Sequence, residues 1–275
     1  MSALEIVEAM NSEDKNVAET VKLALPEIAD AVNLIADRLF QGGRLIYVGA
    51  GTSGRLGVMD ASECPPTFGV SPELIQGLIA GGVSALTDEI EGAEDDSIAG
   101  ESVMKNTGVN RKDVVLGLSA SGTTPFVLAA MEYTKQQGSA RIGLACEMDS
   151  VLLKNVDVAI CVPVGPEILY GSTRLKAGTA QKMILNMLST AVMVKLGKVY
   201  KNHMVDLRVS NIKLVRRAEV MVAELGEVSQ ETATKLLKET GNNVKTAIVM
   251  AKRKINILEA EKNLKAVDGI LSKII

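Results

Sequence analysis

The sequence has few aromatic residues, one histidine and no strong excess of either charge, and each shortage excludes a class of function. Its 275 residues include no tryptophan, four tyrosines and three phenylalanines. Proteins that bind single-stranded nucleic acid stack bases on aromatic rings, and those that bind duplexes carry a marked basic excess. Here 30 lysines and arginines face 33 acidic residues, a net charge of −3, so we expect no nucleic-acid partner.

The single histidine, His203, excludes most zinc sites, histidine-based triads and histidine acid–base schemes. Proton transfer would then fall mainly to carboxylates, and we expect His203 itself to be structural. The three cysteines, Cys64, Cys146 and Cys161, are odd in number and widely spaced, which indicates reduced thiols rather than a disulfide framework. Cys64 adjoins Glu63, but we expect it to pack in the core rather than to act as a nucleophile.

Long apolar runs are also missing, since charged residues or glycines interrupt every hydrophobic stretch before the ~18 to 20 residues that a membrane span needs. We therefore expect no membrane partner. The first fifteen positions carry Glu5, Glu8, Glu13 and Asp14, which does not fit an export signal. The sequence is typical of a cytoplasmic protein.

Short apolar runs, by contrast, recur along the first two thirds of the chain and predict five buried strands. The runs cover residues 44–48, 74–80, 114–118, 141–145 and 158–162. An apolar stripe at helical spacing predicts a helix over 17–40, and further helices are expected over 85–105 and 125–137. Alternating strands and helices predict an α/β fold, a parallel-sheet αβα sandwich whose sheet is covered on both faces.

The last third is predicted to be wholly helical, with helices over 207–225, 230–239, 244–254 and 257–275 and the pair Asn242–Asn243 as a cap. We therefore predict two parts, a sandwich domain with an N-terminal helix over 1–204 and a small C-terminal all-helical module over 205–275. The apolar, methionine-containing stripe on a long helix after Gly178 indicates core or a subunit interface.

Three loops rich in glycine and hydroxyl residues, 49–55, 119–125 and 171–179, are the first candidates for a ligand site. Ligands of open parallel sheets bind beyond the carboxyl ends of the strands, where the first two of these loops lie. Backbone amides at helix N-termini, with serine and threonine hydroxyls, suit the oxygens of a phosphate monoester. Arg55, Arg174, Lys176 and Lys182 add positive charge in or beside the loops, although each loop taken alone could be an ordinary turn.

Two other phosphate motifs do not fit. Gly49, Gly51 and Gly54 match a dinucleotide fingerprint, but the next strand ends in Ala80-Gly81-Gly82 rather than in the acidic residue that holds the ribose. A P-loop sequence is missing as well. A small phosphorylated molecule remains the best substrate class.

Carboxylates for acid–base chemistry occur at Glu63 and in the acidic stretch 88–96. We expect Pro65 and Pro66 to end the helix that carries Glu63 and so to fix its side chain. Glu91, Glu94 and Asp95 would share one face of a helix, which could equally be a solvated surface. Composition does not choose among these carboxylates.

The motifs GAGTSGRLGVMDASECPPTFG, EGAED, SASGTTP and GSTRLKAGTAQKMILNMLSTAVMVKLGKVY closely resemble those of the N-acetylmuramic acid 6-phosphate etherases. The resemblance runs from about Asn11 onward. It implies a sugar isomerase (SIS) domain that binds phosphosugars over residues 1–204. It also implies a homodimer with pockets near the interface.

The resemblance further implies a carbon–oxygen lyase. Such an enzyme cleaves the lactyl ether of N-acetylmuramic acid 6-phosphate to N-acetylglucosamine 6-phosphate and D-lactate, without metal or nucleotide cofactor, in amino-sugar catabolism and peptidoglycan recycling. Two other readings stay open, a non-catalytic phosphosugar sensor and a phosphosugar isomerase of the same superfamily. Neither would release lactate.

The family motifs assign the acid and base to Glu63 and Glu94, with Glu63 protonating lactate and Glu94 taking the sugar proton. Substrate contacts are implied for residues in all three loops: Gly51, Thr52, Ser53, Gly54, Arg55, Ser119, Ser121, Gly122, Thr123, Thr124, Ser172, Thr173 and Lys176. Thr123 stands where we expect an arginine in many members, so one anion contact would be lost or supplied elsewhere. The family usually begins some way upstream, which leaves part of the pocket's rim in question.

Overall fold

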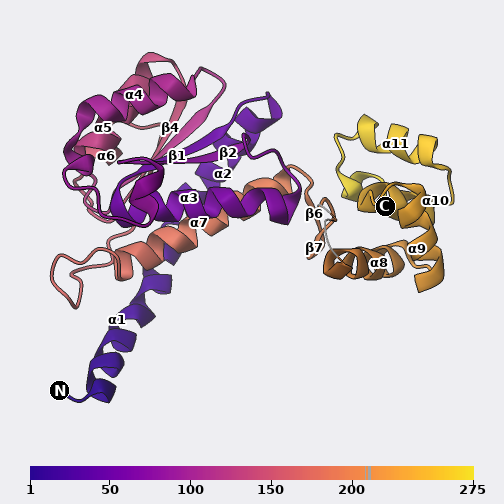
Figure 1. Ribbon diagram of the computed structural model, residues 1–275, viewed down its shortest axis with the longest axis horizontal. Coiled ribbons are helices and arrows are strands. Elements are labelled where there is room, and N and C mark those ends of the chain that lie inside the picture. The colour runs from indigo at the N-terminus through magenta and orange to yellow at the C-terminus, as the bar shows by residue number, and fades with distance from the viewer. Residues whose placement is uncertain (208, 210–211) are drawn as a thin grey trace. The chain divides into compact units, whose positions relative to one another are not determined.

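The computed structural model describes residues 1–207, 209 and 212–275 (Figure 1). Contacts within the chain divide it into two compact units, residues 1–63 with 71–192 and residues 64–70 with 193–275. The domain boundary expected at residue 204 stays a prediction, and positions 208, 210 and 211, at the start of the helix predicted over 207–225, lie outside the described residues.

A parallel five-stranded sheet organises the first unit, as the sequence predicted. The strands are β1 (Leu45–Gly49), β2 (Ile75–Ile79), β3 (Val114–Leu118), β4 (Ala140–Ala145) and β5 (Val158–Cys161). The helices are α1 (Ala3–Leu23), α2 (Leu25–Phe40), α3 (Gly51–Phe68), α4 (Ser97–Thr107), α5 (Pro125–Gln136), α6 (Val151–Lys154) and α7 (Lys176–Lys195). The strand order is β2-β1-β3-β4-β5, with every pair parallel.

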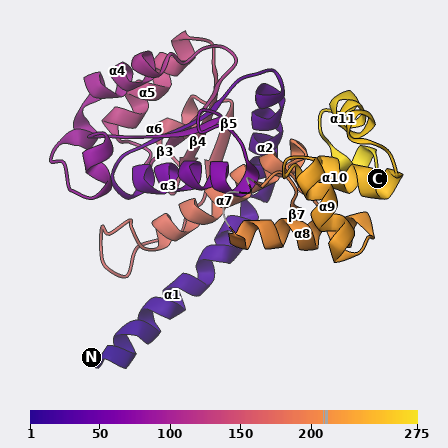
Figure 2. The ribbon, with the colours of Figure 1, turned by 45° about the vertical axis from the view of Figure 1, so that its right-hand side comes forward.

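Helices cover both faces of the sheet, which completes the three layers of the αβα sandwich (Figures 1 and 2). On one face, Ile46, Val48 and Val115 pack with Phe126 of α5 and Leu152 of α6. Helices α2, α3 and α7 lie on the other face. Every residue of β1 and β3 is buried, because a parallel strand covered on both sides has no solvent face.

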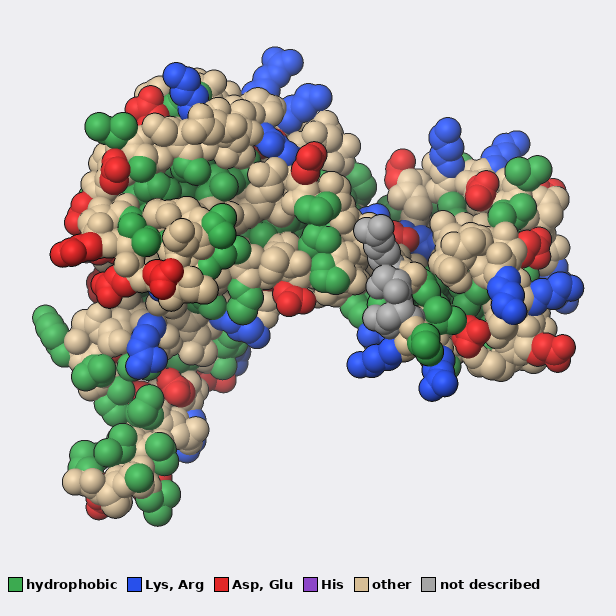
Figure 3. Space-filling view, viewed as in Figure 1, with side chains coloured by type: hydrophobic (Ala, Val, Ile, Leu, Met, Phe, Trp, Pro, Cys, Tyr) green, Lys and Arg blue, Asp and Glu red, His purple; other side chains and the backbone are tan. Residues whose placement is uncertain are grey.

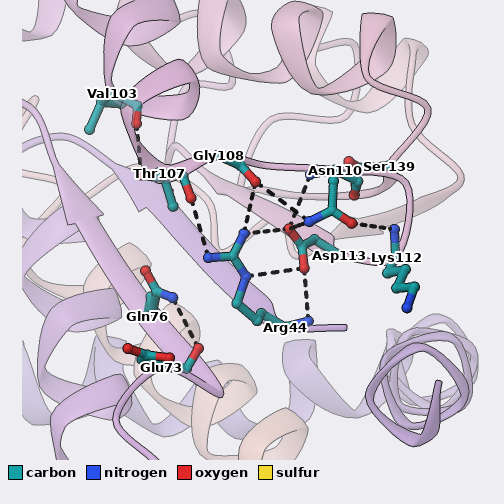
Figure 4. Close-up of polar contacts among 10 residues, drawn as sticks. All are labelled: Arg44, Glu73, Gln76, Val103, Thr107, Gly108, Asn110, Lys112, Asp113 and Ser139. Atoms are coloured by element: carbon teal, nitrogen blue, oxygen red, sulfur yellow. Dashed lines mark hydrogen bonds and ion pairs between the residues drawn. The ribbon is translucent and has the colours of Figure 1, made fainter. Parts of the chain in front are cut away.

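An ion pair between the partly buried Arg44 and the buried Asp113 lies at the end of the sheet where β1 and β3 begin (Figure 4). The Arg44 guanidinium donates to the Asp113 carboxylate with Nη2–Oδ2 at 2.7 Å and Nε–Oδ1 at 3.2 Å. It also donates to the carbonyl oxygens of Thr107 and Gly108 after α4. The hydrogen bond with Asp113 raises the pKa of Arg44. Asp113 is 1% exposed, so one buried carboxylate ties the two central strands to the end of α4.

Three predicted helix boundaries between α1 and α4 are wrong. The stretch 17–40 forms two helices that meet at Ala24, where Pro26 in the first turn of α2 lacks the amide that a continuous helix would use. Residues 85–105 are not one helix, since two 3₁₀ turns, Val83–Leu86 and Ala93–Asp95, precede α4. Pro65 and Pro66 do not end α3, which continues to Phe68 because the fixed φ of proline is itself helical.

The N-terminal half of α1 projects away from the sheet in both ribbon views (Figures 1 and 2). Hydrophobic side chains gather on this projecting end (Figure 3), where Leu4 is 63%, Ile6 46% and Val7 56% exposed. Only farther along the helix are Val17 and Val21 buried. An apolar helical surface that the chain itself leaves uncovered is typical of an interaction site.

The second unit holds a short hairpin, β6 (Val199–Tyr200) and β7 (His203–Met204), followed by helices. These are α8 (Ile212–Gly226), α9 (Gln230–Glu239), α10 (Val244–Arg253) and α11 (Ile257–Ala266). The helix expected over 257–275 is too long, because α11 ends at Ala266 and a 3₁₀ turn follows at Leu271–Lys273. Asn243 caps α10 as predicted, with its Oδ1 accepting from the Thr246 amide.

Charged groups are partly buried inside the second unit. Asp206 Oδ2 lies 2.9 Å from Lys198 Nζ and 2.7 Å from Lys245 Nζ. Burial lowers the pKa of Lys245 although the Asp206 carboxylate opposes the shift. His203 Nε2 lies 3.5 Å from Glu224 Oε1. In the described part of the chain, no helix has both the length and the apolar character to cross a membrane.

Replacing Asp113 with asparagine tests the importance of the buried pair. The variant Asp113→Asn leaves the Arg44 guanidinium without its carboxylate, which we expect to destabilise the folded chain by about 2–4 kcal/mol. Urea unfolding followed by circular dichroism measures the change. The control Asp37→Asn alters an exposed carboxylate on α2 and should stay within about 0.5 kcal/mol of the parent. Equal stability of the two variants would contradict the role given to Asp113.

Candidate active site

Three loops start side by side where β1, β2 and β3 end. Gly49, the last residue of β1, is in register with Ile79 of β2 on one side and with Leu118 of β3 on the other. The segments that follow, beginning at Ala50, Ala80 and Ser119, therefore leave the same edge of the sheet. Parallel sheets bind ligands at this edge.

The turn between β1 and α3 is closed too tightly for side chains at two positions. A Cβ atom on Gly54 would lie 2.6 Å from Ile79 Cγ1 and 2.7 Å from the Gly49 carbonyl oxygen. A Cβ on Gly49 would in turn lie 2.8 Å from the Gly54 amide nitrogen. This contact places the first turn of α3 directly against the carboxyl ends of the strands. Thr52, which is half-buried, and Arg55 therefore lie at the end of the sheet where ligands bind.

A cavity of about 520 Å³ opens beside this turn. Its walls come from the start of α3, the end of β2 and the long loop before α4: Ala50, Gly51, Thr52, Arg55, Ala80, Ala85, Thr87, Asp88, Glu89, Ile90, Glu91, Gly92, Ala93 and Glu94. Among these described lining residues, four are carboxylates and one, Arg55, is a cation. Glu94 is therefore at the cavity, although it stands on a 3₁₀ turn and not on the helical face that the sequence predicted.

Arg55 is bonded to the backbone of the loop opposite. Its Nε donates to the Leu86 carbonyl oxygen at 3.2 Å and its Nη2 to the Asp88 carbonyl oxygen at 2.9 Å. The guanidinium thus connects the start of α3 to the loop of residues 80–96 before α4, the acidic loop.

The loop 119–124 folds into a compact set of hydroxyl groups. Ser119 Oγ lies 2.8 Å from Thr124 Oγ1 and accepts from the Gly122 amide at 2.9 Å. Thr123 Oγ1 donates to Ser121 Oγ at 3.0 Å. The N-cap Thr124 makes no side-chain cap to α5, so the first amides of that helix are open to an anion. The structure therefore brings the predicted phosphate residues together.

The loop before α7 is held by carboxylates of the same chain. Glu167 accepts the amides of Lys176 and Ala177, both at 3.0 Å. The buried Lys176 ammonium lies 2.6 Å from Glu13 Oε2 on α1. A Cβ on Gly178 would lie 3.4 Å from Thr52 Cγ2, so the first turn of α7 packs beside that of α3. Ser172 is half-buried and Thr173 exposed.

Glu63 is not among the residues that line the cavity. It lies on α3, twelve positions after Gly51, or about 18 Å along the helix at 1.5 Å per residue. Its side chain is exposed. The cavity that Glu94 lines is therefore not lined by Glu63 of the same chain.

Two residues that support these loops were missed from the sequence, Ser150 and Glu167. A Cβ on Gly122, whose φ is +66°, would lie 2.4 Å from Ser150 Oγ, so Ser150 packs under the hydroxyl loop. Its buried hydroxyl has no hydrogen-bond partner among the described residues. No glycine- and hydroxyl-rich run marks Ser150, whereas Glu167 stands four positions before the loop 171–179 and could have been sought there.

Cys146, just after β4, lies beneath the same hydroxyl loop, since its amide donates to the Ala120 carbonyl oxygen at 2.9 Å. Burial, with a smaller contribution from Cys161, raises the pKa of its thiol to about 12. Cys161 is less buried, and burial raises its pKa as well. No group of three histidine, cysteine, aspartate or glutamate side chains in the described residues is arranged to hold a metal ion.

The fold and the loops at its strand ends define a phosphosugar-binding protein of the SIS class. A model of the SIS domain matches residues 94–191, and one of the N-terminal SIS domain of glucokinase regulatory protein matches residues 27–135. The model of that protein's C-terminal lid domain matches residues 201–240. Phosphoheptose isomerase from Francisella tularensis shares the fold, with a TM-score of 0.54 and 20% identity over 70% of this chain and 100% of that one.

Relatives of much higher identity extend over nearly the whole chain. The N-acetylmuramic acid 6-phosphate etherase of Clostridium beijerinckii is 50% identical over 99% of this chain and 90% of its own length. That of Serratia proteamaculans is 52% identical over 98% of this chain and 91% of its own. The chain belongs to the N-acetylmuramic acid 6-phosphate etherase family.

The raised pKa of Cys146 predicts slow alkylation. Because only the thiolate reacts, about one Cys146 in ten thousand would be reactive at pH 8. A pKa raised on folding stabilises the folded chain below the ordinary value of 9.0, and this contribution is lost as the pH rises from there toward about 12. Mass spectrometry after iodoacetamide treatment at pH 8 should find Cys161 modified faster than Cys146.

The same treatment in urea is the control, because unfolding returns both thiols to their ordinary pKa. Equal alkylation rates for Cys146 in the native and the urea-unfolded protein would show that the thiol is not held protonated by burial.

Proposed function

We propose that this chain performs the etherase reaction for which its family is named, with Glu63 and Glu94 as its acid and base. The observation that carries the proposal is the identity of about 50% to such etherases over nearly the full chain. The matches to domains of glucokinase regulatory protein cover shorter segments and fit the same fold. The substrate is N-acetylmuramic acid 6-phosphate and the products are N-acetylglucosamine 6-phosphate and D-lactate.

The reaction proceeds by elimination of lactate and addition of water. In the open-chain sugar, the carbon next to the aldehyde carries an acidic proton, and the lactyl ether is attached one carbon farther along. Glu94 removes that proton, the electron pair forms a carbon–carbon double bond, and the ether oxygen leaves with a proton from Glu63. Glu63 then takes a proton from a water that adds to the unsaturated aldehyde, and Glu94, after its proton has exchanged with solvent, protonates the carbon next to the aldehyde. One water is consumed in total.

The hydroxyl loop 119–124 is the proposed place for the phosphate. Its hydroxyls converge within hydrogen-bonding distance of one another, and the uncapped amides of α5 point the positive end of a helix dipole at the same place. Thr52 and the loop before α7 lie beside this position and would hold the rest of the sugar with its lactyl carboxylate. Thr123 carries no positive charge to bind the phosphate, and its hydroxyl donates to Ser121 Oγ.

Two copies of the chain would complete each site. Glu63 does not line the cavity and lies eight positions, or about 12 Å along α3, beyond Arg55, which does, so we place the Glu63 that acts beside Glu94 on a second copy. The exposed apolar end of α1, with Leu4, Ile6 and Val7, is a surface suited to such an association. We accordingly propose a homodimer. A cytoplasmic location is proposed from the reduced cysteines and the acidic start of the chain.

Isotopic labelling tests the reaction. The chain is incubated with N-acetylmuramic acid 6-phosphate in water that carries ¹⁸O and deuterium, and the products are examined by fragmentation mass spectrometry. We expect unlabelled lactate, with ¹⁸O at the sugar carbon that carried the ether and deuterium at the carbon next to the aldehyde. Glu63→Gln should slow lactate release by about a hundredfold or more.

The matched control is Glu101→Gln, which changes an exposed glutamate on α4 and should leave the rate unchanged. A sensor would release no lactate from the substrate, and an isomerase would move the carbonyl without releasing lactate. Full-rate lactate release by Glu63→Gln would remove Glu63 from the mechanism.

Mixing two inactive variants tests the shared site. In a dimer of one Glu63→Gln chain with one Glu94→Gln chain, one of the two sites keeps both glutamates. Random reassembly should then recover about a quarter of the parental activity, because half of the dimers are mixed and half of their sites are intact.

Sedimentation velocity on the same mixture checks that dimers are present. If the two glutamates of one site belonged to the same chain, no mixture of the two variants would regain activity.

A further inference from the structure

We infer that Arg55 is a positioning residue that holds the loop carrying Glu94, and that it does not serve as the ligand of a substrate anion. The inference rests on the proposed function in taking Glu94 as the base. It reverses the assignment that the family resemblance implied for Arg55.

The guanidinium lines the cavity but is engaged by the backbone of the loop. Two of its nitrogens, Nε and Nη2, donate to the carbonyl oxygens of Leu86 and Asp88, two residues apart in the loop. A planar fork with fixed donor directions can satisfy two carbonyls at once, whereas a lysine ammonium is a single point charge. Both hydrogen bonds of Arg55 thus depend on the backbone conformation of the loop and not on its side chains.

Arg55 is itself fixed in place. It follows Gly54, whose close contact with Gly49 and Ile79 leaves no room for even a methyl group. The first turn of α3 therefore cannot shift without breaking this contact. The sheet edge, α3 and the guanidinium form one continuous support for the loop.

From Asp88 onward, the loop reaches Glu94 through short turns. The Ala93 amide donates to the Ile90 carbonyl at 3.2 Å, and the Asp95 amide donates to the Gly92 carbonyl at 3.1 Å. Beyond Glu94, Asp96 caps α4 through the Ala99 amide at 2.8 Å. The loop is thus held on the C-terminal side of Glu94 by the α4 cap and on the N-terminal side by Arg55. Loss of Arg55 would therefore free the segment before Glu94, the proposed base.

The charges around Arg55 point the same way. Asp88, Glu89, Glu91 and Glu94 line the cavity with it. A phosphate or carboxylate bound to Arg55 would face these four carboxylates and be repelled by them. The same carboxylates repel each other, and a cation bonded to the loop backbone offsets that repulsion and keeps the loop closed.

The test combines hydrogen exchange without substrate and steady-state kinetics on Arg55→Lys and Arg55→Gln. We expect faster exchange of the amides of residues 84–95 in both variants, with exchange in the β-strands unchanged. We also expect kcat to fall about tenfold or more, with KM within about threefold of the parent, because a misplaced base slows proton removal without weakening anion binding. The exposed Arg111→Lys is the matched control and should alter neither measurement.

Several results would overturn the inference. A tenfold rise in KM with unchanged kcat and unchanged loop exchange would make Arg55 an anion ligand. A loss of kcat without faster loop exchange would mean that Arg55 acts directly on the reaction, and faster exchange with unchanged kcat would mean that the loop does not position the base. Since exchange needs no substrate, unaltered loop exchange in both variants overturns the inference even if the parental chain releases no lactate. Protected β-strand amides show that each variant folds.

Discussion

The close approach of β1 and α3 is the constraint on which the cavity depends. Gly49 and Gly54 meet where neither position has room for a Cβ atom, so the backbone of the helix start lies against the end of the central strand. The start of the cavity wall and the place of Arg55 follow from that contact. The first turn of α7 lies beside Thr52 on the same face of the sheet, where a Cβ on Gly178 would lie 3.4 Å from Thr52 Cγ2.

Stability and chemistry are separated along the strands. The buried pair of Arg44 and Asp113 closes the edge where β1 and β3 begin, and no ligand loop lies there. At the other edge, the carboxylates of the acidic loop surround a cavity that is open to solvent. Charges that pair with each other lie at one end of the sheet, while the exposed carboxylates at the other end suit the proton transfers that we propose for them.

The strands and the ligand edge were predictable because they depend on local pattern. The run 114–118 matches β3 residue for residue, since a strand buried on both faces must be apolar throughout. The acidic loop was not predictable. Its acidic residues have helical spacing, but 3₁₀ turns form in their place, and α4 begins only at the Asp96 cap. The place of Glu63 outside the cavity was hidden as well, because the acidic loop that carries Glu94 reaches only Gly51, Thr52 and Arg55 of α3, and the sequence does not show where that loop lies against the helix.

The ion pair between Glu13 and Lys176 also affects the N-terminal helix. The lysine is almost wholly buried at the start of α7, and its ammonium is paired with Glu13 of α1. A buried ammonium without a counter-charge is costly, so shortening the chain past residue 13 would leave a cation stranded beside the loop before α7. Although its N-terminal half projects from the sheet, α1 therefore supplies the counter-charge of the buried Lys176.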